Sequence, residues 1–213
     1  MRRSHLSLVA ALALSGAFHA CVSLKRTPEA RFFALRSTAE PPGTAAPASD
    51  PGLIGILPVL LPAYLERPQV VTWAAPGEVR IDEFLRWAEP LDLAVGRVVG
   101  ENLGTLLPSH RILRAPWSGS APLRCRVRLV LTRFGLQPGG EVQLAGRFVL
   151  LPSRRERPLV SRPVELRRGP RGGAAPDPNT SVEAMSELLA ELSREIATAV
   201  AELPSSEAEE APR

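Results

Sequence analysis

Apolar and polar residues alternate along two neighbouring stretches in the second half of the chain, at 123–137 and 141–151, which Pro138-Gly139-Gly140 separates. Alternation of this period puts apolar side chains on one face of a strand and polar side chains on the other. We therefore expect a β-hairpin, followed by a strand near 159–167 that Pro163 confines to an edge or a bulge. Its core side is predicted to hold Leu123, Cys125, Val127, Leu129 and Leu131, and its solvent side Arg124, Arg126 and Arg128.

Two other segments repeat apolar residues at helical spacing. The first covers 91–106, between Pro90 and Pro108, and the second follows the capping pair Thr180 and Glu183 and ends before Pro204. Both are amphipathic, as expected for helices that cover a sheet. One row of the first helix consists of Gly96, Gly100 and Gly104. This row indicates either a close helix–helix contact or close packing on the sheet.

Shorter strand patterns precede the first helix. They lie at 31–36, at 53–60, and at 69–73 and 78–82 on either side of Ala-Ala-Pro-Gly, which is typical of a hairpin. The order of strands and helices predicts an α+β fold, with a largely antiparallel sheet and two amphipathic helices packed on one face.

The N-terminus has the pattern of a secretion signal. Arg2 and Arg3 precede an apolar run of 12 residues, 6–17, which is too short for the roughly 20 residues of a membrane-spanning helix. We assign 1–20 to a signal peptide and expect Cys21 to be the lipidated first residue of the mature protein. Cleavage without lipid attachment is the alternative, because Phe18 is unusual in a lipoprotein signal.

The mature chain is long enough for one domain. We expect a lipidated tether at 21–30, a single domain at 31–203 with a flexible Pro/Ala/Gly linker at about 38–52, and a disordered acidic tail at 204–213. Without the two signal arginines, 24 basic residues face 22 acidic ones, and no compact basic run includes aromatic residues. This nearly neutral balance argues against nucleic acid as a partner.

Residues that perform catalysis or bind metal ions are scarce. His110 is the only histidine after the signal, and no cysteine or carboxylate stands near it at ligand spacing. Cys125 falls on the apolar side of its strand, which favours a buried thiol over a reactive one. We therefore predict no catalytic residues, no metal and no cofactor, and a protein that is not an enzyme.

Aromatic residues and arginines gather between residues 64 and 87. The candidates for a partner or oligomer contact are Tyr64, Arg67, Trp73 and Trp87. Aromatic residues and arginine are enriched at the centres of protein interfaces. The alternative, strongest for Trp87 and the neighbouring Phe84, is that these rings complete the core beneath the first helix.

Two segments carry a family resemblance: PAYLERPQVV at 62–71 and IDEFLRWAEPLDLAVGRVVGENLGTLLP at 81–108. With RFFAL at 31–35, the 124–151 hairpin and LAELSREIA at 189–197, they resemble the ABC-type transport auxiliary lipoprotein family, also called PqiC/YmbA-like. The chain departs from that family's pattern in its weak lipoprotein signal. Glycines also replace alanines in the first helix.

The resemblance implies a non-catalytic lipoprotein at the periplasmic face of the outer membrane. Its partners would be the membrane, through the N-terminal lipid, an MCE-domain (PqiB-like) protein of an intermembrane lipid transport system, and further copies of itself. Val22 in place of Asp after Cys21 also favours the outer membrane. The preferred function is a docking subunit, and the alternatives are a lipoprotein that itself binds a lipid or hydrophobic ligand, and a hydrolase. A carrier needs a dry pocket of several hundred Å³. A docking subunit needs exposed apolar or aromatic patches.

Overall fold

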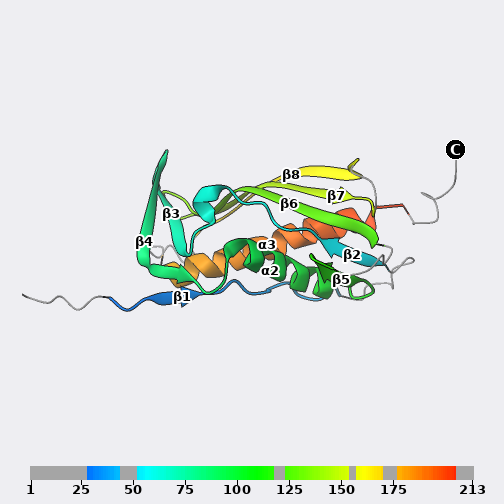
Figure 1. Cartoon of the computed structure of the whole chain (residues 1–213), viewed down its shortest axis with the longest axis horizontal. Helices are drawn as coiled ribbons and strands as arrows, with labels where there is room; N and C mark the ends of the chain where they lie inside the picture. Colours follow the sequence, from blue (N-terminus) through cyan, green and yellow to red (C-terminus); the bar gives the residue numbers. More distant parts are fainter. Residues whose placement is uncertain (1–27, 44–51, 118–122, 154–156, 170–176, 205–213) are drawn as a thin grey trace, which may run out of the picture.

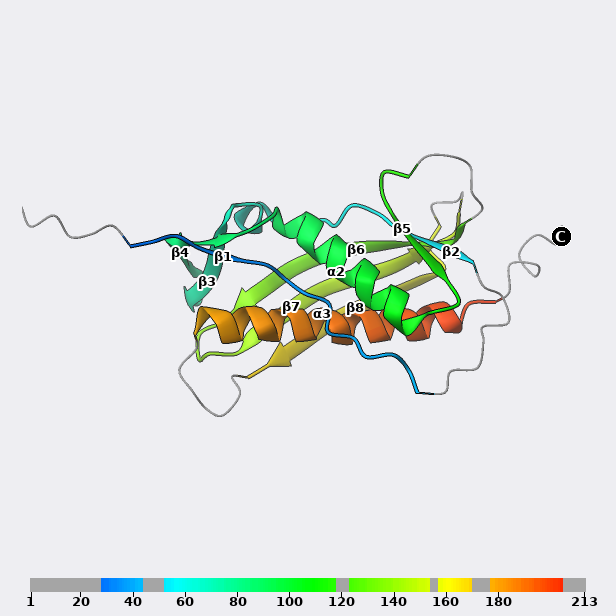
Figure 2. The same ribbon diagram turned by 90° about the horizontal axis from the view of Figure 1, so that it is seen from below.

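Two helices lie against one face of a five-stranded sheet, and a three-stranded sheet adjoins one end of this body (Figure 1). The structure is a computed structural model that describes residues 28–43, 52–117, 123–153, 157–169 and 177–204. The described chain begins at the end with the three-stranded sheet and finishes at the opposite end (Figures 1 and 2). The predicted α+β fold is confirmed, with two sheets in place of one.

The larger sheet has the strand order β5-β2-β6-β7-β8. Its strands are β5 (Arg111–Arg114), β2 (Leu53–Ile56), β6 (Leu123–Leu136), β7 (Val142–Leu151) and β8 (Val160–Arg168). The long β6–β7–β8 ladders are antiparallel, whereas β2 pairs in parallel with both β5 and β6. The hairpin and the edge strand containing Pro163 are therefore confirmed.

Core packing follows the alternation along the first part of β6, where half-buried Arg124 and Arg126 alternate with buried residues. Cys125 and Val127 are buried as predicted. The register shifts between Leu53 and Ile54, which leaves Arg124 as an extra residue between the partners of these two positions. Arg124 Nη2 donates to the carbonyl of Leu203, just after the last helix, at 3.0 Å. Arg124 thus keeps its predicted place in the alternation, between the buried Leu123 and Cys125, and its long side chain reaches the residue that follows the last helix.

Helix α3 (Pro178–Ala201) covers the β6–β7–β8 part of the sheet. Its N-cap is Asp177, whose carboxylate accepts from the backbone N–H of Asn179 at 3.2 Å. Pro178 takes the first helical position, where a missing N–H removes no hydrogen bond. The helix thus begins before the predicted capping pair Thr180 and Glu183, because Asp-Pro is the stronger start signal.

Helix α2 (Leu91–Leu106) packs between α3 and the β2–β5 side of the sheet. A methyl group built at Gly96 would lie 3.6 Å from Val59, and one built at Gly100 would lie 3.3 Å from Ile56. One built at Gly104 would lie 4.0 Å from Ile112. The glycine row therefore faces β2, β5 and the segment after β2, which confirms packing on the sheet over a helix–helix contact.

The smaller sheet has the order β1-β4-β3, formed by β1 (Arg31–Phe33), β4 (Glu78–Trp87) and β3 (Gln69–Ala75). Strands β3 and β4 form the predicted hairpin, which is longer than its pattern indicated. Strand β1 pairs in parallel with the last residues of β4. A one-turn 3-10 helix, η2 (Ala63–Leu65), leads into β3.

After β1 the chain crosses the helix layer as an extended segment, residues 34–39, which we call the strap (Figure 2). The buried Asn102 of α2 holds it, because Asn102 Oδ1 accepts hydrogen bonds from Ser37 Oγ, Thr38 N and Ala39 N at 2.7, 3.2 and 3.1 Å. Residues 38 and 39, predicted to belong to a flexible linker, are thus bonded to the body. Residues 44–51 of that linker lie outside the described residues.

Candidate functional site

An aromatic cluster formed by Tyr64, Trp73 and Arg133 lies where the β3–β4 hairpin meets the larger sheet. The Tyr64 and Trp73 rings meet edge to face, with their centroids 5.7 Å apart and their planes at 77°. The guanidinium of Arg133 lies 6.0 Å from the centre of the Trp73 ring, within the range of a cation–π contact. Both rings remain partly exposed. The cluster therefore presents two rings and an arginine at the surface.

A hydrogen bond fixes Tyr64 in this cluster. Its hydroxyl donates to the backbone carbonyl of Thr132 at 3.1 Å. Partial burial raises the pKa of Tyr64, while the nearby charge of Arg133 acts in the opposite direction. The phenol is therefore a neutral donor at physiological pH, and its ring orientation is set before any partner binds.

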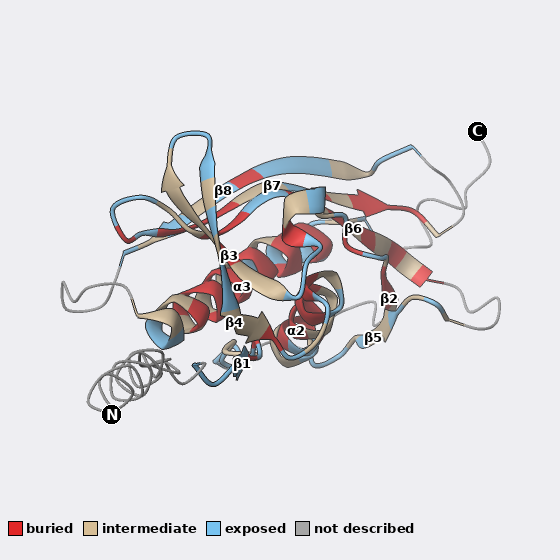
Figure 3. Cartoon of the chain, turned by 60° about the vertical axis from the view of Figure 1, so that its left-hand side comes forward, coloured by how far each residue is buried: buried red, intermediate tan, exposed pale blue. Residues whose placement is uncertain are grey.

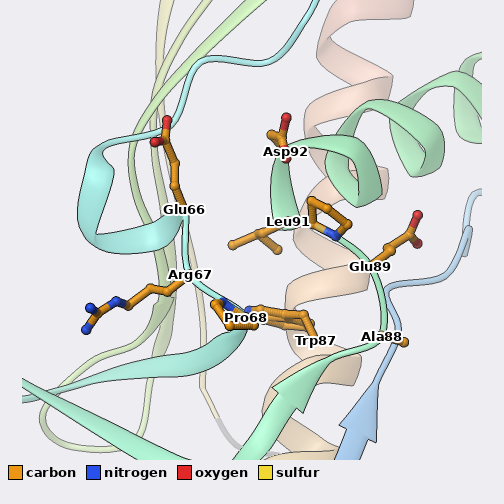
Figure 4. Close-up of a pocket in the computed structure, with 9 residues that line it drawn as sticks. Glu66, Arg67, Pro68, Trp87, Ala88, Glu89, Leu91 and Asp92 are labelled. Atoms are coloured by element: carbon orange, nitrogen blue, oxygen red, sulfur yellow. The ribbon is translucent and has the colours of Figure 1, made fainter.

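A groove of about 470 Å³ lies at the same end of the molecule. The residues after η2 form one wall, and the β4–α2 connection forms the other (Figure 4). Its lining residues are Glu66, Arg67, Pro68, Trp87, Ala88, Glu89, Pro90, Leu91 and Asp92. In Figure 4 the apolar side chains of Pro68, Trp87 and Leu91 lie between these walls, and the Arg67 guanidinium extends away from them. The groove thus combines an apolar base with charged edges.

One of the three carboxylates in this groove is already neutralised. Arg97 donates from Nε to Glu89 at 3.0 Å and from Nη1 to Glu101 at 3.1 Å. The hydrogen bond to Glu89 is the main cause that raises the pKa of Arg97. Glu66 and Asp92 are left to give the groove edge a negative potential beside Arg67. A dry lipid pocket would not carry such an edge.

The structure separates the four predicted contact residues. Tyr64 and Trp73 come together in the aromatic cluster, and Arg67 is exposed at the groove. Trp87 is only 7% exposed and packs in the core at the base of the groove. For Trp87 the core alternative is therefore correct, because its strand turns that side chain inward beside the start of α2. Figure 3 shows the contrast between the buried helix layer and the hairpin, whose residues are mostly exposed or intermediate.

No pattern in the sequence indicates that Arg133 belongs to this site. It lies on β6, more than 50 positions from Trp73, and joins the ring only because β6 and β3 lie side by side. The groove could not be predicted from the sequence either, because its walls come from two connections that are not adjacent in the sequence.

The residues considered for chemistry lie apart from this surface. Cys125 is fully buried, as predicted, and burial raises the pKa of its thiol to about 11. His110 lies half-buried after α2, at the far end of that helix from the groove. Among the described residues, no group of three or more His, Cys, Asp or Glu side chains could hold a metal ion.

The predicted anchor residue, Cys21, lies outside the described residues, as do the signal and most of the tether and tail. Within the described parts of the chain, no helix is long and apolar enough to cross a membrane. Attachment of the domain to a membrane through Cys21 is therefore still a prediction.

The fold and the site define a small α+β domain that displays an aromatic surface beside an open groove. The chain belongs to the family of ABC-type transport auxiliary lipoprotein components, whose model matches residues 33–197. The resemblance seen in the sequence is thereby confirmed. Membership places the protein among auxiliary components of transporters and among lipoproteins, a class associated with membranes and with a transporter partner.

Two solved structures share the fold. A crystal structure of an uncharacterised protein is 20% identical, with a TM-score of 0.66, over 81% of this chain and 99% of that one. Protein XCC0632 from Xanthomonas campestris, of family DUF330, is 17% identical, with a TM-score of 0.66, over 79% of this chain and 93% of that one. No curated protein matches the sequence.

Proposed function

We propose that the protein is a docking subunit of an MCE-protein-based intermembrane lipid transport system. In this proposal, lipid on Cys21 anchors the domain at the periplasmic face of the outer membrane. Its exposed surface then receives the MCE-domain protein. Family membership supports the role of a transport auxiliary lipoprotein. The outer membrane and the MCE-domain partner come from the sequence resemblance and are the parts that need testing.

The observation that carries the proposal is the aromatic cluster on the hairpin. Two rings that are held in place yet partly exposed, with an arginine stacked on one of them, have the composition of an interface centre. A fixed ring loses little conformational entropy when a partner covers it. Exposed Arg67 at the neighbouring groove extends the same surface with a charge.

Self-association is part of the proposal and would use the same end of the domain. A head-to-tail contact between identical subunits forms a ring when its rotation closes. A ring of subunits at the membrane would surround the end of the MCE-domain protein, which in this proposal is the conduit for lipid. The MCE-domain protein and a second copy could therefore share this surface.

The test is a Trp73→Ala, Arg67→Glu double variant of the lipidated full-length protein. We expect it to lose capture of the MCE-domain protein by at least tenfold and to keep most of its unfolding free energy, because Arg67 is exposed and Trp73 is partly exposed. Trp117→Ala is the matched control, since it removes a half-buried indole near β5, at the opposite end of the molecule. Undiminished capture and unchanged oligomer mass in the folded double variant would refute the contact surface.

A second candidate function is binding of a hydrophobic ligand, which the groove of about 470 Å³ favours by its size. Its charged edges argue for a ligand with a polar head. Leu91→Trp would fill the base of the groove, and native mass spectrometry of protein from membranes would report any bound lipid. Loss of a co-purified lipid in this variant, with partner capture intact, would support the carrier over the docking subunit.

A further inference from the structure

We propose that the end of the domain that carries β1 faces the membrane and that Phe32 contacts the bilayer surface. The proposal deepens the function above and rests on the lipid anchor at Cys21. It follows from three features of the molecule: where the tether leaves the domain, how short the tether is, and which side chains are exposed at that end.

The tether leaves the domain at one end of its long axis. Strand β1 lies beside β4 and the start of both helices, far from β5 and the end of α3 (Figures 1 and 2). Several bonds hold it there. Ala88 N donates to the Phe33 carbonyl at 2.8 Å, Arg97 Nη2 donates to the Leu35 carbonyl at 2.8 Å, and Arg31 Nη2 donates to Asn179 Oδ1 at 3.1 Å. The exit point of the tether is therefore fixed relative to the body.

The tether is short compared with the domain. Only six residues separate Cys21 from Pro28, where the described chain begins, so an extended tether reaches at most about 25 Å. Helix α3 alone, with 24 residues, is about 36 Å long and runs away from this end. A lipid anchor at Cys21 therefore keeps the β1 end close to the bilayer. The tether cannot reach back along the body to bring the β5 end to the membrane.

Apolar side chains are exposed at this end. Phe32 is 66% exposed, although the adjacent Phe33 is only 8% exposed and belongs to the core. Leu93, in the first turn of α2, is 57% exposed. Transfer of an exposed phenyl ring from water into the lipid interface is favourable, because it removes apolar surface from water. Phe32 is therefore placed to enter the interface without any rearrangement of the core.

The segment of the chain that contains Phe32 is basic. Arg31 is exposed next to Phe32, and the tether sequence carries Lys25 and Arg26 against the single carboxylate of Glu29. Basic residues beside a bilayer are attracted to anionic head groups. An exposed aromatic ring next to an exposed arginine has the composition of a peripheral membrane contact, so a lipid surface is the occupant that Phe32 and Arg31 fit.

The orientation can be measured with a fluorescent label on a single introduced cysteine. The native Cys125 does not compete for the label, because it is fully buried and its thiol is protonated at neutral pH. The lipidated full-length protein, as Phe32→Cys or as the control Arg111→Cys, is reconstituted in phosphatidylethanolamine/phosphatidylglycerol vesicles that contain a spin-labelled quencher lipid. Arg111 is exposed on β5, at the opposite end. We expect at least threefold stronger quenching of the label at position 32 than at position 111. The emission of the label at position 32 should also shift to the blue, and only when vesicles are present.

A second variant tests Phe32 itself. A label at Arg31→Cys should lose at least half of its quenching when Phe32→Ser is added, while both proteins keep the same lipid mass on Cys21. Equal quenching at 32 and 111 in lipidated protein would overturn the orientation and leave the anchor standing. A blue shift at position 32 without vesicles would assign Phe32 to a protein contact and overturn the membrane contact. Absence of lipid on Cys21, seen by mass spectrometry, would overturn both the anchor and the orientation.

Discussion

Replacing Asn102 with alanine should loosen residues 37–39 of the strap, while Arg97 and Ser186 still bond to Leu35 and Arg36. Three donors of the strap converge on Asn102 Oδ1: Ser37 Oγ at 2.7 Å, Thr38 N at 3.2 Å and Ala39 N at 3.1 Å. The Asn102 side chain is fully buried in α2. Alanine therefore removes one acceptor and leaves a hydroxyl and two backbone N–H groups without their partner.

The size of the effect follows from these three bonds. Each contributes about 1 kcal/mol net, and a buried donor left without an acceptor costs about as much again. Residues 37–39 are half-buried, so water replaces part of the lost bonding. We expect the Asn102→Ala protein to lose about 2–3 kcal/mol of unfolding free energy. Ser37→Ala removes only one of the three donors and should cost about 1 kcal/mol.

Urea denaturation measures the stability change, and amide hydrogen exchange locates it. Exchange at Thr38 and Ala39 should accelerate in Asn102→Ala, whereas exchange in β6 and β7 should change only through global stability. Thr105→Ala is the control, since Thr105 Oγ1 donates to the Glu101 carbonyl of the same helix, at 3.2 Å, and this bond does not involve the strap. A loss below 1 kcal/mol with unchanged exchange at Thr38 and Ala39 would refute the role of Asn102.

Two further predictions concern the core. Burial raises the pKa of Cys125 from 9.0 to about 11, so unfolding releases its proton between these values and stability should fall by about 2–3 kcal/mol as pH rises from 9 to 11. Denaturation at pH 8 and pH 11 should show this fall in the native protein and less of it in Cys125→Ala. Gly96→Ala should stabilise α2 by up to about 1 kcal/mol, because its new methyl would lie 3.6 Å from Val59. In thermal melts Gly146→Ala should be strongly destabilising, because its methyl would collide with the Val130 carbonyl; equal melting temperatures for the two glycine variants would contradict both contacts.

Elements with a local signal were predicted from the sequence. The β6–β7 hairpin follows a period of two residues over a long stretch, and α2 and α3 follow a helical period. The buried position of Cys125 follows from the same alternation. In each case the pattern lies in residues that are close together in the sequence, so a single sequence is enough to predict the element.

Features that depend on distant pairings were not predicted. Strand β2 has four residues and pairs in parallel with two strands far from it in the sequence, and its register with β6 shifts between Leu53 and Ile54. The strap depends on Asn102, more than 60 positions away. No local period encodes such contacts. For the same reason the composition of 64–87 predicted the aromatic residues of the site, but it could not decide that Trp87 turns inward and Trp73 outward.

The strap has a consequence for how the domain meets a transport partner. Strand β1 and the strap tie the N-terminal segment to β4, α2 and α3, so a force on the proposed anchor at Cys21 would pass directly into the body of the domain. Strands β3 and β4, from which the aromatic cluster and the groove are partly built, lie at the same end as β1 (Figure 1). In the proposed orientation a partner would therefore dock next to the bilayer, where lipid has to pass between the conduit and the membrane. A docking surface at the β5 end would instead hold the partner at least the length of α3 away from it.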